Sequence, residues 1–200
     1  MKGRRLWEIG GFLAGGVLIV FGVVAIALGV NGFTTVRDSL KQEQITFGSA
    51  DDPAVAKHAE QWAGEQVKTG DQARAFAKII REHTLGSTDG LTYAEMGRFQ
   101  SAANPDDPAG TSDEEAAAKD ENGQPISNGA RNIWITATAL TTALNTSYMA
   151  ERLAVFGLVV GVALLLTGIG LVILAFGVFG RRERAEETAK SSALSAITAG

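Results

Sequence analysis

The chain has 200 residues, with 18 Lys or Arg against 22 Asp or Glu and no cysteine. The lack of cysteine excludes thiol nucleophiles, disulfide bonds and cysteine-ligated zinc or iron–sulfur centres. The charge is unevenly distributed, because residues 31–152 carry 11 basic and 18 acidic side chains whereas the two ends together carry 7 and 4. An acidic central part argues against nucleic acid as a partner, since phosphate backbones are bound by clustered Lys and Arg.

Two uncharged apolar runs predict membrane-spanning helices. The first, 9–30, has 22 residues and the second, 153–179, has 27, and neither contains Asp, Glu, Lys, Arg or His. As α-helices they would extend about 33 and 40 Å, compared with about 30 Å for the hydrocarbon core of a bilayer. The predicted fold class is therefore an all-α membrane protein, an antiparallel hairpin of two transmembrane helices that carries a small extracytoplasmic helical domain at 31–152.

Basic residues gather outside both runs, where they predict the topology. Lys2, Arg4 and Arg5 precede the first run, and Arg181, Arg182 and Arg184 follow the second. The positive-inside rule then places both termini, 1–8 and 180–200, in the cytoplasm of a protein of the plasma membrane.

A cleaved signal peptide is the competing interpretation of the first run. Lys2–Arg5 resembles a basic n-region, and Ala25-Ile26-Ala27 resembles a small-residue cleavage site. The apolar run continues past that site through Leu28 and Val30, and no polar region precedes it. We favour retention of the run as a membrane helix.

Between the runs, capping signals and periodicity predict further helices. Residues 33–46 extend the first helix, Asp52-Pro53 begins a helix that reaches about 67, and Thr69-Gly70-Asp71 begins another at 72–83. Thr92 and Glu95 fit a capping box that would begin a helix at 93–103. Residues 104–124, rich in acidic residues, Pro and Gly, predict a mobile loop.

From residue 128 onward the pattern favours one helix of 52 residues, 128–179, that contains the second run. Its inner seam is predicted from a 4-3-4-3 spacing at Ile133, Ala137, Leu140, Leu144 and Ser147. The extension of the first helix, around Val36 and Leu40, is the expected antiparallel partner of this seam.

Small residues spaced four apart predict close helix packing in the membrane. Three such pairs are candidate packing sites: Gly11 with Gly15, Ala25 with Gly29, and Gly157 with Gly161. In lipid, close backbone approach matters more because no hydrophobic effect drives helices together. The pairs fit packing of the two spans against each other, or of copies of the protein.

Few residues suggest chemistry. The absence of ionisable groups from both runs argues against transport. His58 and His83 with Glu60 or Glu82 would formally make an iron site, although His58 reads more simply as a packing partner of Trp62.

Asn104, Asp106 and Glu115 match three positions of a calcium loop, but Pro108 and Ala109 depart from it. We therefore expect no metal, no cofactor and no enzymatic activity.

The Thr-rich stretch 136–146, with Trp134 and Tyr148, is a candidate lining for a lipid or quinone groove. Tyr148 is equally suited to anchor the helix at the membrane interface. We favour the anchor.

Three segments, 92–99, 127–134 and 144–151, carry a family resemblance. They resemble an uncharacterised group of two-pass membrane proteins of high-GC Gram-positive bacteria, often labelled as subunits of an aromatic ring-opening dioxygenase. The resemblance implies the architecture over about residues 10–180. It implies no activity, because ring cleavage needs an iron site for which this chain offers only two histidines.

These observations predict a structural or accessory membrane protein that scaffolds itself or a larger complex. Its partners would be the lipid bilayer and either a second copy or another membrane protein. The alternative is a binding or sensing module for a lipid, peptide or envelope component, which requires a pocket among residues 53–103.

Overall fold

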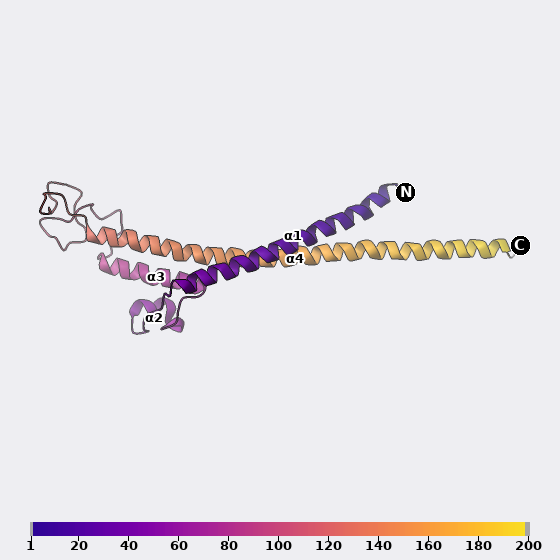
Figure 1. The fold of residues 1–200 in the computed structure, drawn as a ribbon, viewed down its shortest axis with the longest axis horizontal. Coiled ribbons are helices and arrows are strands. Elements are labelled where there is room, and N and C mark those ends of the chain that lie inside the picture. Colours follow the sequence, from indigo (N-terminus) through magenta and orange to yellow (C-terminus); the bar gives the residue numbers. More distant parts are fainter. Residues whose placement is uncertain (1, 199–200) are drawn as a thin grey trace. The chain divides into compact units, whose positions relative to one another are not determined.

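The computed structural model describes the backbone of residues 2–198 and the side chains of residues 9–177. The described part is helical, with isolated β-bridges but no β-strand, as predicted. Its elements are α1 (Lys2–Gln42), α2 (Pro53–Ala59), the short 3-10 helix η1 (Glu60–Trp62), α3 (Gly70–Ser87) and α4 (Gly129–Thr198) (Figure 1).

The chain forms two compact units. Unit 1 consists of the beginning of α1, up to Asn31, and the part of α4 from Leu153 onward. Unit 2 consists of residues Gly32–Arg152. These divisions lie within one residue of the limits of the two apolar runs.

Unit 1 contains the apolar parts of two helices, each long and apolar enough to cross a membrane. Many of their large side chains face outward: Phe21 is 63% exposed, Leu28 66% and Leu174 66%. A water-soluble protein rarely leaves so large a contiguous apolar surface uncovered. In length, composition and exposure these two helices are therefore candidate membrane spans.

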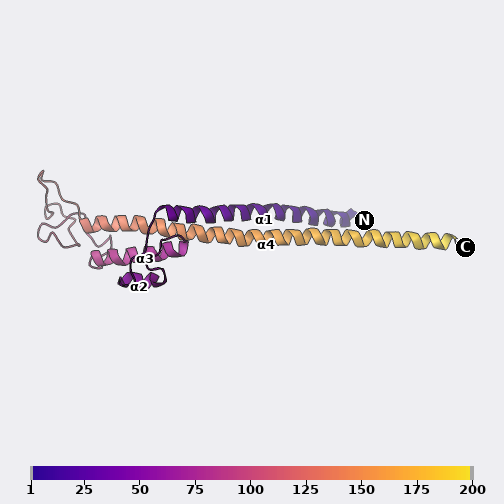
Figure 2. The same cartoon turned by 60° about the horizontal axis from the view of Figure 1, so that its bottom comes forward.

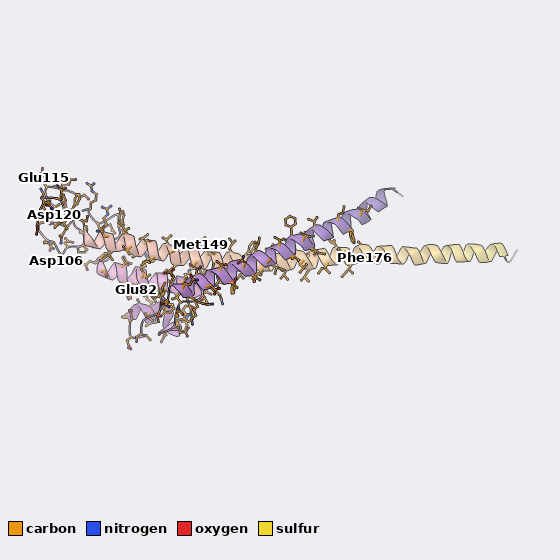
Figure 3. The ribbon with its side chains drawn as sticks, in the orientation of Figure 1. Glu82, Asp106, Glu115, Asp120, Met149 and Phe176 are labelled. Atoms are coloured by element: carbon orange, nitrogen blue, oxygen red, sulfur yellow. The ribbon has the colours of Figure 1, made fainter. Side chains whose placement is uncertain are left out.

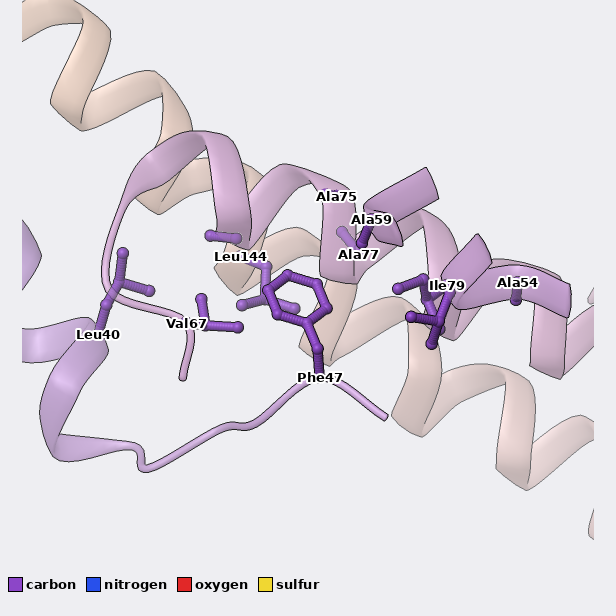
Figure 4. Close-up of a cluster of buried hydrophobic side chains, with 11 residues drawn as sticks. Leu40, Phe47, Ala54, Ala59, Val67, Ala75, Ala77, Ile79 and Leu144 are labelled. Atoms are coloured by element: carbon purple, nitrogen blue, oxygen red, sulfur yellow. The ribbon is translucent and has the colours of Figure 1, made fainter. Parts of the chain in front are cut away.

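Unit 2 is organised around an apolar core. Phe47 lies among the buried side chains and is 3% exposed (Figure 4). Its ring is stacked on that of Trp62, with 6.0 Å between ring centres, and edge-on to that of Phe76, with 5.4 Å between centres. Leu40 of α1 and Leu144 of α4 belong to the same buried cluster. The part of α1 in unit 2 thus shares this core with α4.

Capping residues begin α2 and α3 where the sequence predicted. The Asp52 carboxylate accepts a hydrogen bond from the Ala54 N–H at 2.8 Å, and Pro53 occupies the first turn. Thr69 and Gln72 form a reciprocal capping box at the start of α3. The two helices lie side by side (Figure 2).

The helix predicted over 53–67 is shorter in the structure. α2 ends at Ala59 and η1 ends at Trp62, and Gly64 then adopts φ +75°, which favours glycine. This turn lets Gln66 form a bridge with Thr46. The backbone groups of this stretch are therefore satisfied by a neighbouring segment instead of by further helical turns.

The helix predicted over 93–103 does not form. The Glu95 carboxylate does accept hydrogen bonds from the Thr92 N–H and hydroxyl, both at 2.7 Å, but only turns follow. Phe99 instead exchanges backbone hydrogen bonds with Thr111, at 2.9 and 2.8 Å. The local capping contacts are present, but the backbone conformation is determined by pairing with a segment that is distant in sequence.

Residues 104–124 form turns and bridges within an extended connection between α3 and α4 (Figure 3). Buried Asn128 ties this connection to α4. Its side-chain amide donates to the carbonyl oxygens of Gly97 and Pro108 at 3.1 and 2.9 Å, and its Oδ1 accepts from the Ala130 N–H at 3.0 Å. The mobility expected for residues 104–124 stays a prediction.

The inner face of α4 in unit 2 is rotated from the predicted seam. Ala137 and Leu144 are buried as expected, whereas Ile133 and Leu140 are about half exposed. The observed inward positions are instead Trp134, Ala137, Leu144 and Glu151. A polar residue thus completes the seam, which an apolar periodicity could not reveal.

Candidate functional site

The closest helix contacts of unit 1 are made by glycines. A Cβ at Gly15 would lie 2.9 Å from the carbonyl oxygen of Gly168, and one at Gly168 would lie 2.7 Å from that of Gly15. Gly22 and Gly161 face each other in the same reciprocal way, at 2.8 and 2.9 Å. Each of these positions therefore requires glycine, because the obstructing atoms belong to the opposite backbone.

These contacts form a regular seam, which we call the glycine seam: Gly15 against Gly168, Gly22 against Gly161, and Gly29 against Ala154. The residue number rises along α1 as it falls along α4, so the two segments run antiparallel. Both helices repeat their small residues every seven positions. A seven-residue repeat keeps one stripe of each helix facing its partner along a left-handed crossing.

Some of the predicted packing residues contact the other helix and some do not. Gly15, Gly29 and Gly161 lie in the glycine seam, whereas a Cβ at Gly157 would lie 4.0 Å from the carbonyl oxygen of Ala25, an ordinary contact. A Cβ at Gly11 would meet nothing within 4 Å.

Gly22 and Gly168 belong to the glycine seam but were absent from the sequence-based set. A search for glycines seven apart would have found both, because Gly22 follows Gly15 and Gly168 follows Gly161 at that spacing.

In unit 2, the Glu151 carboxylate joins three helices. Its Oε1 accepts from the Arg37 guanidinium of α1 at 3.0 Å, and its Oε2 accepts from the Gly70 N–H at the start of α3 at 2.6 Å. Glu151 is 8% exposed. A carboxylate at a helix N-terminus is favoured by the free N–H groups and by the helix dipole.

Two further contacts join the first turns of α3 to α4. Asp71 forms an ion pair with Arg152, and the Arg74 guanidinium lies 4.6 Å from the centre of the Tyr148 ring. Arg152 also approaches this ring, at 5.2 Å. Tyr148 is thus held between two cations of unit 2, and its expected role as an interfacial anchor stays a prediction.

An apolar groove of about 500 Å³ lies in unit 2 between α1, α3 and α4. It is lined by Ser39, Leu40 and Glu43, by Ile45 and Thr46, by Phe76 and Ile80, and by Leu140, Ala143, Leu144 and Ser147. Neither Trp134 nor Tyr148 belongs to this lining, contrary to the groove considered from the sequence. Only Phe76 and Ile80 come from the range 53–103.

The groove lies at the C-terminal end of α1. The helix stops at Gln42, and Gln44 takes the left-handed conformation with φ 53°, which turns the chain away. Leu140, one of the lining residues, is 51% exposed. Glu43 is the only charged lining residue, and it has no ion-pair or hydrogen-bond partner among the side chains at 9–177.

The two histidines pair with different carboxylates. His58 Nε2 lies 2.7 Å from Glu82 Oε2, and His83 Nε2 lies 3.0 Å from Asp52 Oδ2. Hydrogen bonds from Lys57, then His58, lower the pKa of Glu82. The pKa of Asp52 is lowered chiefly by the N–H of Ala54, with a contribution from the His83 side chain. Each histidine therefore joins α2 or its capping residue to α3.

Metal-ligating side chains do not gather in the part of the chain that the structure describes. Within it, no three His, Asp or Glu residues are grouped so that they could hold a metal ion. Asp106 and Glu115, two positions of the weak calcium-loop match, lie apart in the connection between α3 and α4 (Figure 3).

Comparisons with protein-family models, curated proteins and solved structures gave no match. The family resemblance noted above therefore stays a prediction, and any function must be argued from the geometry.

Proposed function

We propose that the chain is a two-pass membrane protein with a structural or accessory role. The apolar parts of α1 and α4 cross the plasma membrane as an antiparallel hairpin, and unit 2 is its extracytoplasmic helical domain. The observation that carries this proposal is the glycine seam. Its reciprocal backbone contacts supply the packing that holds helices together where lipid removes the hydrophobic driving force.

The seam also supports retention of the first run as a membrane helix. Three glycines of α1, at 15, 22 and 29, each meet a small residue of α4. A signal peptide removed near residue 27 would take Gly15 and Gly22 with it. A matched set of contacts on both helices is expected for a permanent pair of spans.

The topology proposed for the hairpin follows from charge. The basic flanks outside both runs keep 1–8 and 180–200 in the cytoplasm, whereas unit 2 carries an excess of acidic residues. Both spans satisfy the same orientation.

Cysteine labelling tests this topology, because the chain has no cysteine of its own. We expect Asn122→Cys to react with a membrane-impermeant maleimide on intact cells. Ser192→Cys should react only after the cells are permeabilised. The opposite pattern, or equal labelling of both variants on intact cells, would overturn the orientation.

Crosslinking in native membranes tests the accessory role. We expect amine-reactive crosslinkers to trap either a homo-oligomer or a fixed partner, because a scaffolding protein acts through stable contacts with what it assembles. Recovery of a lone monomer at every crosslinker concentration would contradict a scaffolding function.

The groove of unit 2 favours a second candidate function, that of a binding module. Its volume of about 500 Å³ falls within the roughly 300–1,000 Å³ of small-molecule sites. Binding and scaffolding are compatible, since one chain can hold a ligand and also assemble with a partner. Variants of the groove distinguish the two functions: a variant that loses ligand binding but still assembles would show that binding and assembly are independent.

A further inference from the structure

We propose that the groove of unit 2 binds one alkyl chain of a membrane lipid whose headgroup carries an ammonium group. The inference deepens the binding function and rests on the membrane insertion proposed above. It depends on three features of the groove: its lining, its one charge, and its place along the helices.

The lining of the groove suits a hydrocarbon chain. Seven of its eleven residues are apolar: Leu40, Ile45, Phe76, Ile80, Leu140, Ala143 and Leu144. A chain bound there would cover apolar surface that α1 leaves open at Leu140. Removing apolar area from water stabilises a complex by about 25 cal/mol per Å² before the losses of association are subtracted.

The one charge of the groove selects the headgroup. Glu43 is exposed and unpaired within the described side chains, and three hydroxyl residues lie in the same lining: Ser39, Thr46 and Ser147. A carboxylate beside hydroxyl groups complements an ammonium group, which offers only hydrogen-bond donors. It repels a headgroup whose net charge is negative.

The place of the groove along the chain supports a lipid over a soluble ligand. On α4 its lining runs from Leu140 to Ser147, and the apolar run begins at Leu153. On α1 its lining begins at Ser39, and the first run ends at Val30. The groove residues of α1 thus follow the first apolar run closely in the sequence, and those of α4 closely precede the second.

A partner helix fits these dimensions less well. An amphipathic helix docks through anchors at i, i+3 or i+4, and i+7, and a stable interface covers about 800 Å² on each partner. The groove extends over only about two turns of α4, from Leu140 to Ser147. A single chain of a small amphiphile matches that length.

Photoactivatable lipids test the proposal on the full-length protein in phosphatidylcholine nanodiscs. Two probes carry the same diazirine-bearing acyl chain, one as phosphatidylethanolamine and the other as phosphatidylglycerol. After irradiation, the labelled peptides are mapped by mass spectrometry. We expect phosphatidylethanolamine to label 39–46 and 140–147 about two- to fivefold more than phosphatidylglycerol, a preference of the size that a partly exposed ion pair supports.

Matched variants separate the chain from the headgroup. Ala143→Phe fills the groove and should abolish labelling of both peptides by both probes. Ala139→Phe, which adds the same ring at an exposed position of α4 outside the lining, should change nothing. Glu43→Gln should equalise the two probes, whereas Glu60→Gln, an exposed carboxylate outside the groove, should preserve the preference.

The outcomes distinguish this inference from the proposed membrane insertion. Labelling of 9–30 and 153–177 without labelling of the groove peptides would overturn the lipid site and leave the spans supported. Labelling that Ala143→Phe does not reduce, or equal labelling by both probes in the unmodified protein, would also overturn it. Failure to label either apolar run would contradict membrane insertion itself.

Discussion

The two units of this protein hold their helices together by opposite means. In unit 1 the helices meet at glycines, where side chains are absent and backbones approach closely. In unit 2 they meet through side chains: the ring of Phe47 fills the core, and Glu151 joins three helices. In water, apolar burial drives helices together, whereas in lipid close contact between backbones must do so.

The largest effect should come from removing the central ring of unit 2. Phe47→Ala leaves a cavity among Trp62, Phe76 and Leu144, and truncation of a buried phenylalanine destabilises a protein by about 3–5 kcal/mol. We expect the urea midpoint of unit 2 to fall sharply when the fluorescence of half-buried Trp62 and buried Trp134 is followed in detergent. The pairing of the two spans should survive.

That survival can be measured by intramolecular crosslinking. The rings of Phe12 and Phe176 lie 5.7 Å apart in unit 1, so Phe12→Cys with Phe176→Cys should react with a short bis-maleimide within one chain. If Phe47→Ala abolished this crosslink, the units would not be held independently.

The next effect concerns the polar junction of unit 2. Glu151→Ala leaves the Arg37 guanidinium and the Gly70 N–H without their acceptor, and we expect a loss of about 2–3 kcal/mol in unfolding free energy. The value lies below that of a fully buried pair because the Arg37 side chain is 36% exposed.

Two control variants sharpen the junction test. Arg152→Ala removes an exposed pair with Asp71 and should lower the unfolding free energy much less than Glu151→Ala, because solvent screens exposed ion pairs. Glu60→Ala removes an exposed carboxylate and should stay within about 0.5 kcal/mol. An equal loss in all three variants would show that Glu151 has no special role.

A variant of the glycine seam tests unit 1 alone. Gly22→Leu places a side chain against the backbone of Gly161 and Leu165, and overpacking of this kind costs about 1–3 kcal/mol. We expect the Phe12–Phe176 crosslink to fall while the urea midpoint of unit 2 stays unchanged. Gly16→Leu, at a glycine with open space around it, is the matched control and should leave the crosslink intact.

The smallest effect should appear on acidification. The pKa values of Glu82 and Asp52 are lowered in the folded protein, so both carboxylates contribute stability above their unfolded pKa values, near 4. This contribution is lost as the pH falls through the lower folded values. Thermal unfolding of unit 2 should therefore show a decline below about pH 4 that is smaller in Glu82→Gln. An unchanged pH dependence in that variant would count against the Lys57–Glu82–His58 contact.

Short-range signals made much of this fold predictable. Asp52 and Thr69 begin helices because their side chains bond to backbone N–H groups two or three residues away. The two apolar runs likewise needed only composition and length. Where the deciding partner was distant, prediction failed: Thr92 and Glu95 made their local contact, yet the chain followed the pairing of Phe99 with Thr111.

The candidate sites were likewise predictable only where they depended on neighbouring residues. Glycine pairs indicated that the helices of unit 1 pack closely, but the partners of Gly15 and Gly22 depend on the register between two segments far apart in sequence. The groove depends on where α1 ends, which is determined by the left-handed Gln44. A non-glycine residue in that conformation carries no reliable signal in a single sequence.

The seven-residue repeat of the glycine seam restricts the register that the two helices of unit 1 can adopt against each other. A one-residue change of register, which turns α4 by about 100° and moves it by about 1.5 Å, would bring Ile169, Val162 and Val155 opposite the three glycines of α1, where no side chain fits. All three glycines first meet small residues again after a shift of seven, which is about 10 Å along the helix. The glycine seam therefore permits one register between the two helices and excludes the registers up to six residues away.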